Sequence, residues 1–284
     1  MLSNIPYDYH MHSNFSSDSD ASVGVMCASA IQKGIPEIGL SEHYDLHPKE
    51  QPIFYRPEAW WEEIERVRKS LDGLLVLRAG VEIGEPHRFP SEAQSLIESY
   101  PYDYVIGSLH YAGDDFMFDN ELLERKGVDE IMQSYFLELG EMTRAAQFDI
   151  LGHMDVPVRN GKPIWGSYDP RRYEALIRVV LQNCIDRGIA LEVNSGGLRR
   201  PARNLMPDPL ILRWYAEMGG RRLTLGSDAH APADVGLHLD QVLKAIRDAG
   251  LKSITRYKRR QPSLLPLESH ETGIHPHPQR QSSM

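Results

Sequence analysis

Seven short apolar runs in this chain each end at side chains that can bind a metal ion. These terminal residues are His10 and His12, Glu42 and His43, Glu82, His110, His153, Glu192 and Asn194, and Asp228 and His230. Segments with apolar residues at three- and four-residue spacing separate the runs, as in amphipathic helices. Strands that alternate with helices pair in parallel, so their carboxyl ends gather at one mouth of a barrel. We therefore expect an α/β barrel of seven strands with a metal site at that mouth.

The connections between the expected elements differ in length. The helix-like segments cover residues 21–33, 57–71, 91–99, 127–147, 170–187, 209–218 and 235–249. Turns from helix to strand are short and contain glycine, whereas the strand-to-helix loops (44–57, 83–91, 111–126, 154–169 and 195–208) are long and polar. Long loops in compact domains are commonly functional, and these all belong to the ligand-bearing mouth. The run 253–258 is a candidate for a further edge strand.

The size of the chain suits one such barrel. It has 284 residues, of which 41% are hydrophobic, and a barrel of this type uses about 250 residues as a single domain. We expect residues 1–261 to form that domain. Beyond them the composition shifts to proline, serine and histidine without periodicity, which predicts a disordered tail over residues 262–284. We interpret His270, His275 and His277 as solvated residues of this tail.

Charge and hydropathy disfavour several classes of partner. The net charge is −9 and the pI is near 5.7, which argues against a broad basic surface for nucleic acid. No apolar stretch approaches the ~18 residues of a membrane span, and the first residues lack the features of a secretory signal. Cys27 and Cys184 show no ligand spacing, so we expect reduced, packed cysteines. These features predict a cytoplasmic protein that binds neither membrane nor nucleic acid.

Six of the twelve histidines occupy strand ends. Alternate side chains on a strand point the same way, so His10 and His12 can clamp one ion. An isolated pair of this kind is more often a surface or core feature than a metal site. Here, however, four other predicted strand ends also carry a histidine, at positions 43, 110, 153 and 230. This distribution favours a metal centre.

Carboxylates complete the predicted centre. Glu82 ends a long apolar run, and a buried carboxylate must be neutralised or bonded. Its two oxygens can bridge two ions, which makes Glu82 the natural shared ligand. Asp228 could serve similarly on the same face as His230, or it could be the N-cap of the segment that follows. Asp18 and Asp20 follow the first strand, and either could be a ligand or a helix cap.

Taken in order, these motifs resemble the polymerase-and-histidinol-phosphatase (PHP) superfamily over about residues 7–260. The motifs are H-x-H, S-E-H, G-V-E, S-L-H, G-H and G-S-D-A-H, and GSLHYAG and GSDAHAPADVG are most similar to the histidinol-phosphatase branch. The resemblance implies a TIM-like, distorted (β/α)7 barrel with three divalent ions. The implied ligands are His10, His12, Glu82 and Asp228 for the first ion, Glu82, His110 and His153 for the second, and Asp18, His43 and His230 for the third. Because Ser19 stands where the family often has glycine, Asp20 remains an alternative to Asp18.

Such a centre suits the hydrolysis of a phosphate monoester. Three divalent ions outweigh three carboxylates, so a phosphate dianion fits the pocket and a metal-bridging hydroxide could attack phosphorus. Arg159 and Arg199 lie on mouth loops where the similar family binds phosphate, and guanidinium groups suit bidentate phosphate contacts. Solvated loop arginines are the alternative, and Arg200 or Arg203 could take this role instead. We expect Glu82, Asp228, Arg159 and Arg199 to be the catalytic residues, and we expect Glu192 either to orient ligands or to pair with an arginine.

The predicted activity is therefore hydrolysis of L-histidinol phosphate in histidine biosynthesis. Alternatives are a phosphodiesterase or exonuclease of the same superfamily, a phosphatase for another small monoester, an amidohydrolase barrel, and a non-catalytic metal-binding barrel. Nitrogen and oxygen ligands without thiolates suit zinc, manganese or iron. The sequence ranks neither the general acid nor the residues that contact the imidazole and amine, for which the loops offer Asp115, Asp119, Glu85, Tyr55, Phe54 and Trp165. It leaves the oligomeric state open.

Overall fold

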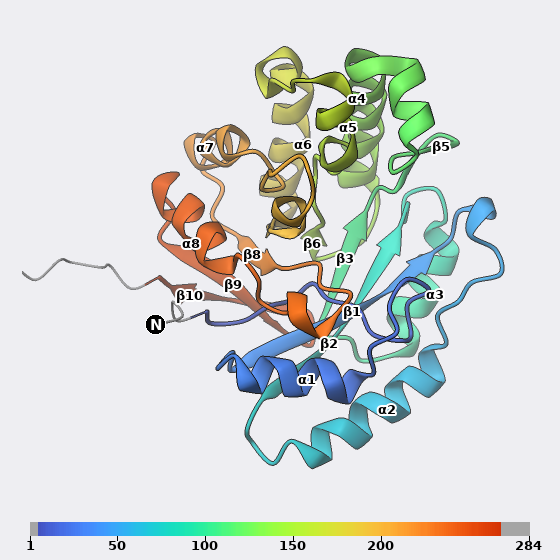
Figure 1. Cartoon of the computed structure of the whole chain (residues 1–284), viewed down its shortest axis with the longest axis vertical. Coiled ribbons are helices and arrows are strands. Elements are labelled where there is room, and N and C mark those ends of the chain that lie inside the picture. The colour runs from blue at the N-terminus through green and yellow to red at the C-terminus, as the bar shows by residue number, and fades with distance from the viewer. Residues whose placement is uncertain (1–4, 268–284) are drawn as a thin grey trace, which may run out of the picture.

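Six parallel strands form a curled sheet at the centre of the computed structural model, which describes residues 5–267 (Figure 1). The strand order is β1-β2-β3-β6-β7-β8. Their bounds are Glu37–Asp45 for β1, Val76–Gly84 for β2, Tyr104–Ser108 for β3, Ile150–Leu151 for β6, Ala190–Asn194 for β7 and Leu223–Gly226 for β8. Neighbouring strands are consecutive along the chain and joined by helical connections, as a barrel of this class requires.

The segment 8–12 occupies the seventh strand position. It lies between the two edge strands of the sheet, with parallel bridges from Asp8 to Ile38 of β1 and from Met11 to Ala229 just after β8. These are isolated bridges and not a continuous ladder, so the barrel is distorted at this point. The predicted TIM-like α/β barrel is confirmed in this distorted form.

Helices surround the sheet on its outer side, with α1 and α2 on one flank and α4 and α6 on the opposite flank (Figure 1). The long helices are α1 (Val23–Gln32), α2 (Pro57–Ser70), α3 (Pro90–Ser99), α4 (Asn120–Ala145), α6 (Glu174–Arg187), α7 (Pro209–Glu217) and α8 (Leu239–Asp248). Each overlaps one of the predicted helices. Among residues 5–267, none of the helices combines the length and the apolarity needed to cross a membrane.

The loops at the mouth contain more structure than predicted. The loop 154–169 contains a short helix, α5 (Val158–Trp165). Because it is short and contains Pro163, the spacing of its apolar residues does not predict a helix. The loop 111–126 contains a hairpin of β4 (Tyr111–Ala112) and β5 (Asp115–Phe116) and the start of α4. Single 3-10 turns are η1 (Pro48–Glu50), η2 (Pro170–Tyr173), η3 (Gly196–Arg199) and η4 (Pro232–Asp234).

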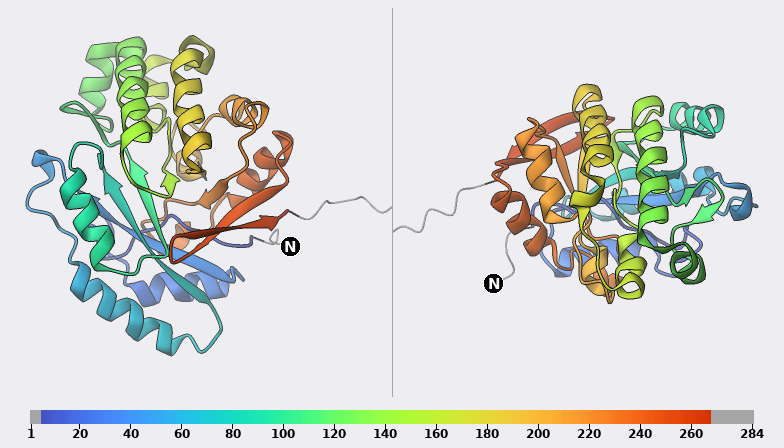
Figure 2. Two further views of the ribbon diagram at one scale, coloured as in Figure 1. Left: turned by 180° about the vertical axis from the view of Figure 1, so that it is seen from behind. Right: turned by 90° about the horizontal axis from the view of Figure 1, so that it is seen from above.

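A C-terminal hairpin packs across the far end of the barrel. Strands β9 (Ser253–Lys258) and β10 (Gln261–Pro266) form an antiparallel pair, in front in the rear view of Figure 2. The Tyr7 hydroxyl donates to the Thr255 carbonyl at 2.6 Å, and the Tyr257 hydroxyl donates to the Asp149 carbonyl at 3.0 Å. The predicted strand 253–258 therefore exists, but it is not an edge of the barrel sheet.

The hairpin also corrects the predicted tail. Residues 262–266 belong to β10, because Leu264 and Leu265 pair with Thr255 and Ile254 of the strand before them. The apolar pair interrupts the proline- and serine-rich composition on which the tail prediction depended. Residues 268–284, with His270, His275 and His277, lie outside the described residues.

Aromatic side chains fill the barrel interior below the mouth. The rings of Tyr7, Tyr9 and Tyr104 stack with centroid distances of 4.1 and 5.0 Å. Gly39 and Gly80 on adjacent strands make room for the Tyr104 ring, since a Cβ at either position would lie within 2.5 Å of it. With this end filled, the polar strand ends at the opposite mouth are the part of the interior that remains free for ligands.

Candidate active site

The nine predicted ligands converge at the mouth of the barrel. They come from segment 8–12 (His10, His12), the loop before α1 (Asp18), β1 (His43), β2 (Glu82), and the residues that follow β3 (His110), β6 (His153) and β8 (Asp228, His230). Most of these side chains are buried, and Asp18 and His230 are the more exposed members. Side chains from seven separate parts of the chain therefore meet in one place.

Glu82 is the centre of the cluster and is fully buried. Five imidazole nitrogens lie within 3.6 Å of its carboxylate oxygens: those of His10, His12 and His43 around Oε2, and those of His110 and His153 around Oε1. Each oxygen thus faces its own group of imidazoles. This is the arrangement that a carboxylate bridging two cations needs.

Several of these polar atoms form no hydrogen bond although they are buried. They are Nε2 of His10, Nε2 of His12, Nδ1 of His43 and Oε2 of Glu82. An unpaired buried polar atom costs about 1–3 kcal/mol, so four around one point need a partner of another kind. A divalent cation satisfies imidazole nitrogens and a carboxylate oxygen together. The donor set therefore fits a metal centre.

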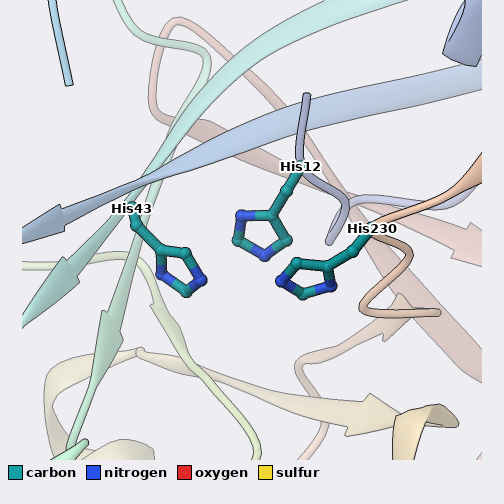
Figure 3. A group of neighbouring side chains, drawn as sticks. All are labelled: His12, His43 and His230. Carbon is teal, nitrogen blue, oxygen red and sulfur yellow. The ribbon is translucent and has the colours of Figure 1, made fainter. Parts of the chain in front are cut away.

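A second group surrounds Asp18. Its Oδ2 lies 3.0 Å from Nε2 of His230 and 3.5 Å from Nε2 of His43. Figure 3 shows the ring of His12 between the rings of His43 and His230, at centroid distances of 4.2 Å to each. These three histidines offer ligand atoms within 4.8 Å of one another, so His12 lies where the predicted first and third sites adjoin.

Of the two candidate aspartates, the structure brings Asp18 to the histidines. Asp20 is exposed, and among residues 5–267 it forms no ion pair with any of them. Neither aspartate caps α1, because Ser22 is the N-cap of that helix. The geometry therefore favours the Asp18 register for a ligand at this place.

Asp228 follows β8 in a left-handed backbone conformation, with φ of 56°. Its Oδ1 lies 3.5 Å from Nε2 of His12 and 3.8 Å from Nε2 of His10. It caps no helix in the described part of the chain, since η4 begins only at Pro232. The alternative of an N-cap is thus wrong, and the carboxylate faces the histidines.

Further carboxylates hold the imidazole rings from behind. Glu192 contacts Nδ1 of His10 at 2.7 Å and accepts the backbone N–H of His153 at 2.7 Å. Asp45 lies 2.9 Å from Nδ1 of His110. Such contacts fix the tautomer and orientation of metal-binding histidines. Orienting ligands was one of the two predicted roles of Glu192. Asp45 was not predicted from the sequence, although it lies two residues from His43 on the same strand face.

Glu42, in the S-E-H motif, does not face the centre. Its carboxylate accepts hydrogen bonds from the Ser13 backbone N–H at 2.9 Å, from the Ser16 hydroxyl at 2.7 Å and from the Trp60 indole at 3.1 Å. Ser16 in turn lies 3.2 Å from Nδ1 of His12. Glu42 therefore anchors the loop after segment 8–12, on the strand face opposite His43.

The local charges set the protonation of the cluster. Burial, together with the imidazoles of His43 and His230, lowers the pKa of His12 to about 3, so the ring is neutral and its lone pair is free for a cation. Burial alone would raise the pKa of Glu82, but the imidazoles of His10 and His43 hold that pKa well below its usual range. Glu82 is therefore an ionised bridging group at neutral pH.

A cavity of about 410 Å³ opens above the cluster. Arg159 from α5 and Arg200 line it. The Arg159 guanidinium lies 3.5 Å from Oδ2 of Asp228 and 4.2 Å from the ring centroid of Phe118. Burial lowers the pKa of Arg159, Asp228 offsets this, and the charge of Arg200 lowers it further. Two neighbouring guanidinium groups in a partly buried pocket suit a dianion.

Arg199 is not in this pocket. Its guanidinium donates to the carbonyl of Ser227 at 2.7 Å and to that of Asp228 at 2.8 Å, and it lies 3.5 Å from Oδ2 of Asp234. The structure thus places Arg199 behind the Asp228 turn, and it places its neighbour Arg200 where Arg199 was predicted. A 3-10 turn over Gly196–Arg199 decides which arginine faces the pocket, and sequence spacing does not resolve such a turn.

Comparisons with known proteins assign the chain to a family. A profile of the family described as the PHP domain matches residues 8–196. A Clostridium acetobutylicum protein named a probable histidinol-phosphatase is 28% identical over 257 residues, covering 89% of this chain and 97% of that protein. The histidinol-phosphatase of Lactococcus lactis is 27% identical over 252 residues, covering 88% and 93%.

Solved structures show the same fold. A crystal structure of the Lactococcus lactis histidinol phosphate phosphatase, complexed with zinc, L-histidinol and phosphate, matches with a TM-score of 0.84 at 25% identity. The match covers 91% of this chain and 98% of that chain. A structure from Listeria monocytogenes matches with a TM-score of 0.71 at 18% identity and covers 83% of this chain.

Proposed function

The chain belongs to the PHP domain family, and we propose that it is a metal-dependent phosphatase that hydrolyses L-histidinol phosphate to L-histidinol and phosphate in histidine biosynthesis. The observation that carries this proposal is the group of buried, unpaired ligand atoms around Glu82, below a pocket with two arginines. The substrate follows from the likeness, over nearly its whole length, to the Lactococcus lactis enzyme solved with zinc, L-histidinol and phosphate.

The proposed centre holds three divalent ions, which would be zinc, manganese or iron. We assign His10, His12, Glu82 and Asp228 to the first ion, Glu82, His110 and His153 to the second, and Asp18, His43 and His230 to the third. Contacts of 3.0 to 3.8 Å among these groups support the assignment. When bound, the ions supply an activated water nucleophile and offset the charge on the phosphate oxygens.

The chain's own residues position the substrate. Arg159 and Arg200 bind the phosphate from the wall of the pocket, where each can donate two N–H groups to its oxygens. Arg159 is held by Asp228 and by the face of Phe118, so its guanidinium is orientated before the substrate arrives. Arg199 has a different task in this proposal: it fixes the backbone of the Asp228 turn and thereby the Asp228 carboxylate.

A reducing compartment suits this chain. Cys27 and Cys184 are both free and buried, and burial raises the pKa of each thiol to about 12. Neither thiol is therefore set up as a reactive thiolate. We place the enzyme in the cytoplasm, where a biosynthetic enzyme with reduced cysteines is expected.

The experiment that tests this function is a substrate panel on the purified, metal-loaded protein. We expect kcat/KM for histidinol phosphate to exceed that for p-nitrophenyl phosphate at least ~100-fold, about 2.7 kcal/mol of recognition. A p-nitrophenyl phosphodiester and single-stranded DNA test the alternative of a phosphodiesterase or exonuclease. A higher kcat/KM for either of these, or for another monoester, would replace the proposed substrate.

A further inference from the structure

The loop that follows β8 carries two of the proposed metal ligands. This loop, residues 227–236, contains Asp228 and His230 and leads to α8. Asp228 has a left-handed backbone conformation, with φ of 56°, and His230 is half-buried. A residue with a Cβ keeps such a backbone conformation only where the surrounding contacts determine it. The position of both ligands therefore depends on the groups that hold this loop.

Asp8 holds both ends of the 227–236 loop. Its Oδ1 accepts the backbone N–H of Ser227 at 2.9 Å, and its Oδ2 accepts the backbone N–H of Gly236 at 2.9 Å. The backbone of Asp8 is itself fixed on β1, because its carbonyl accepts the N–H of Gly39 at 2.8 Å and its N–H donates to the Glu37 carbonyl at 3.2 Å. One carboxylate thus ties the first and the last residue of the loop to the barrel.

The burial of Asp8 has no explanation in the metal centre or in the phosphate site. The side chain is fully buried, and among residues 5–267 it forms hydrogen bonds with backbone N–H groups but no ion pair. A buried carboxylate without a cationic partner is costly. An apolar side chain would avoid this cost, but it could not accept two N–H groups at once. The two ends of the loop therefore account for a carboxylate at this position.

Helix α1 holds the middle of the same loop. The ammonium group of Lys33, directly after this helix, donates at 3.2, 2.7 and 2.8 Å to the carbonyls of Pro232, Ala233 and Val235. The Ser29 hydroxyl donates to the Pro232 carbonyl at 2.5 Å. Lys33 is only half-buried, so it can be replaced without opening the core. It therefore offers a second, independent way to loosen the loop.

We propose that Asp8 is a positioning residue for the metal centre, because it fixes the 227–236 loop and thereby the Asp228 carboxylate and the His230 ring. The inference rests on the proposed function, in which these two side chains are metal ligands. Asp8 contacts neither of them through its side chain, so its loss should weaken metal binding without removing a ligand. The ion assigned to Glu82, His110 and His153 takes no ligand from the loop and should be spared.

Asp8→Asn tests this role, because the amide has the shape of the carboxylate but only one acceptor oxygen. Competition between the metal-free protein and a chelator gives the dissociation constant of each zinc ion. We expect Asp8→Asn to raise this constant at least about 10-fold for one ion or two and to leave another unchanged. Because every ligand is still present, saturating zinc should restore kcat on histidinol phosphate to within about 2-fold of wild type. Asp228→Ala, which removes a ligand, should not recover in this way.

Glu37→Gln is the matched control, since Glu37 is a buried carboxylate on the neighbouring strand that pairs with Arg78 and not with the loop. It should lower the unfolding free energy but leave every zinc dissociation constant at its wild-type value. Lys33→Met should raise the same constants as Asp8→Asn by a smaller factor, and it decides the question if Asp8→Asn does not fold.

Two results would overturn the inference. One is wild-type zinc affinity in Lys33→Met and in a folded Asp8→Asn. The other is a loss of zinc affinity in Glu37→Gln as large as that in Asp8→Asn, because general destabilisation would then explain both. A wild type that binds no zinc would instead contradict the proposed function.

Discussion

Glu82 shows how one residue can organise a cluster of histidines. Its carboxylate is fully buried, with His10, His12 and His43 around one oxygen and His110 and His153 around the other. A buried carboxylate is costly unless it is paired. Five imidazoles provide that pairing, together with the ions of the proposed centre, so the site and the local fold are expected to depend on the same charge balance.

Removing the two kinds of carboxylate should therefore give different losses of metal. Asp18 contacts only the more exposed group with His43 and His230, so Asp18→Ala should bind about one equivalent less metal and retain reduced turnover. Glu82→Ala should lose more metal and essentially all activity, because both members of a bridged pair lose a ligand. Elemental analysis after dialysis, with kcat measured in parallel, checks this.

Asp20→Ala is the matched control, since Asp20 is an exposed aspartate two residues away. It should bind as much metal as wild type. The opposite pattern, in which Asp20→Ala loses an ion and Asp18→Ala does not, would assign the ligand to Asp20. A wild type that binds no more than two ions at saturation would remove the third site.

Alanine variants of the three arginines should differ in their kinetics and in their metal content. We expect Arg159→Ala to cost roughly 2–5 kcal/mol in kcat/KM because a partly buried contact with the phosphate dianion is lost. Arg200→Ala should also lower kcat/KM, but less, since Arg200 is exposed. Arg199→Ala should instead weaken metal retention, because it releases the turn that holds Asp228.

Steady-state kinetics on histidinol phosphate and metal analysis of the three variants decide between these roles. If Arg199→Ala kept its full metal content and lost substrate affinity as strongly as Arg159→Ala, the phosphate role would return to Arg199. Wild-type kinetics in Arg159→Ala would show that other groups hold the phosphate.

At the scale of elements, the strand ends were predictable and the loop details were not. Seven apolar runs with ligands at their carboxyl ends indicate where His10, His43 and Glu82 must meet, because parallel strands share one mouth. Which group contacts each ring nitrogen depends on the conformation of turns, and the spacing of residues in the sequence does not predict that conformation. Helix α5 is eight residues long and contains Pro163, so it has too few apolar repeats to be recognised from the sequence. Arg200 and not Arg199 faces the pocket because of a single 3-10 turn, which is also too short to be predicted.

Asp155 links two of these loops. It follows β6, its Oδ2 accepts the backbone N–H of Asp208 at 2.9 Å, and Asp208 is the N-cap of α7. Burial raises the pKa of Asp155 to about 8. In the unfolded chain the pKa of an aspartate is near 3.9. Between about pH 4 and pH 8, Asp155 is therefore protonated in the folded protein and ionised in the unfolded chain.

The sign of the pH dependence follows from that difference. The contribution of Asp155 to stability is complete below about pH 4 and is lost as the pH rises towards 8. Asp155→Asn has no such loss. We therefore expect the difference in unfolding free energy between Asp155→Asn and wild type to shift in favour of the variant. The shift should reach up to about 1.4 kcal/mol per pH unit between pH 5 and 8.

Denaturant titrations of both proteins at several pH values, with metal saturating, measure this difference. It should level off above about pH 8, where Asp155 is ionised in both states. A difference that stays constant across the range would mean that the carboxyl group is already ionised in the folded protein, and that its burial is compensated in another way.

At the scale of the whole molecule, charge is distributed unevenly. The chain carries a net charge of −9, yet Arg159 and Arg200 face the pocket with the cluster of histidines and carboxylates below them. Stacked tyrosines and the β9–β10 hairpin fill the opposite end of the barrel. Over residues 5–267 the fold thus leaves the ligand-bearing mouth open, in keeping with barrel enzymes, whose active sites lie at the carboxyl ends of the strands.

The class of fold followed from the alternation of strands and helices, and the meeting of the histidines at one mouth followed from their positions at five strand ends. The distortion of the barrel followed only from the resemblance, because in sequence segment 8–12 looks like an ordinary strand although it pairs through isolated bridges. The pocket wall made by η1 and the β4–β5 hairpin was not predicted either, since these two segments meet only in the folded chain.

The most direct test of the account is removal and return of metal with histidinol phosphate as substrate. The protein is chelated and dialysed until elemental analysis finds no divalent metal, and phosphate release is then measured before and after zinc, manganese or iron is added. We predict that turnover disappears with the metal and returns with at least one of these ions. Undiminished release of phosphate by fully metal-free protein, or none by protein reloaded with all three ions, would contradict it.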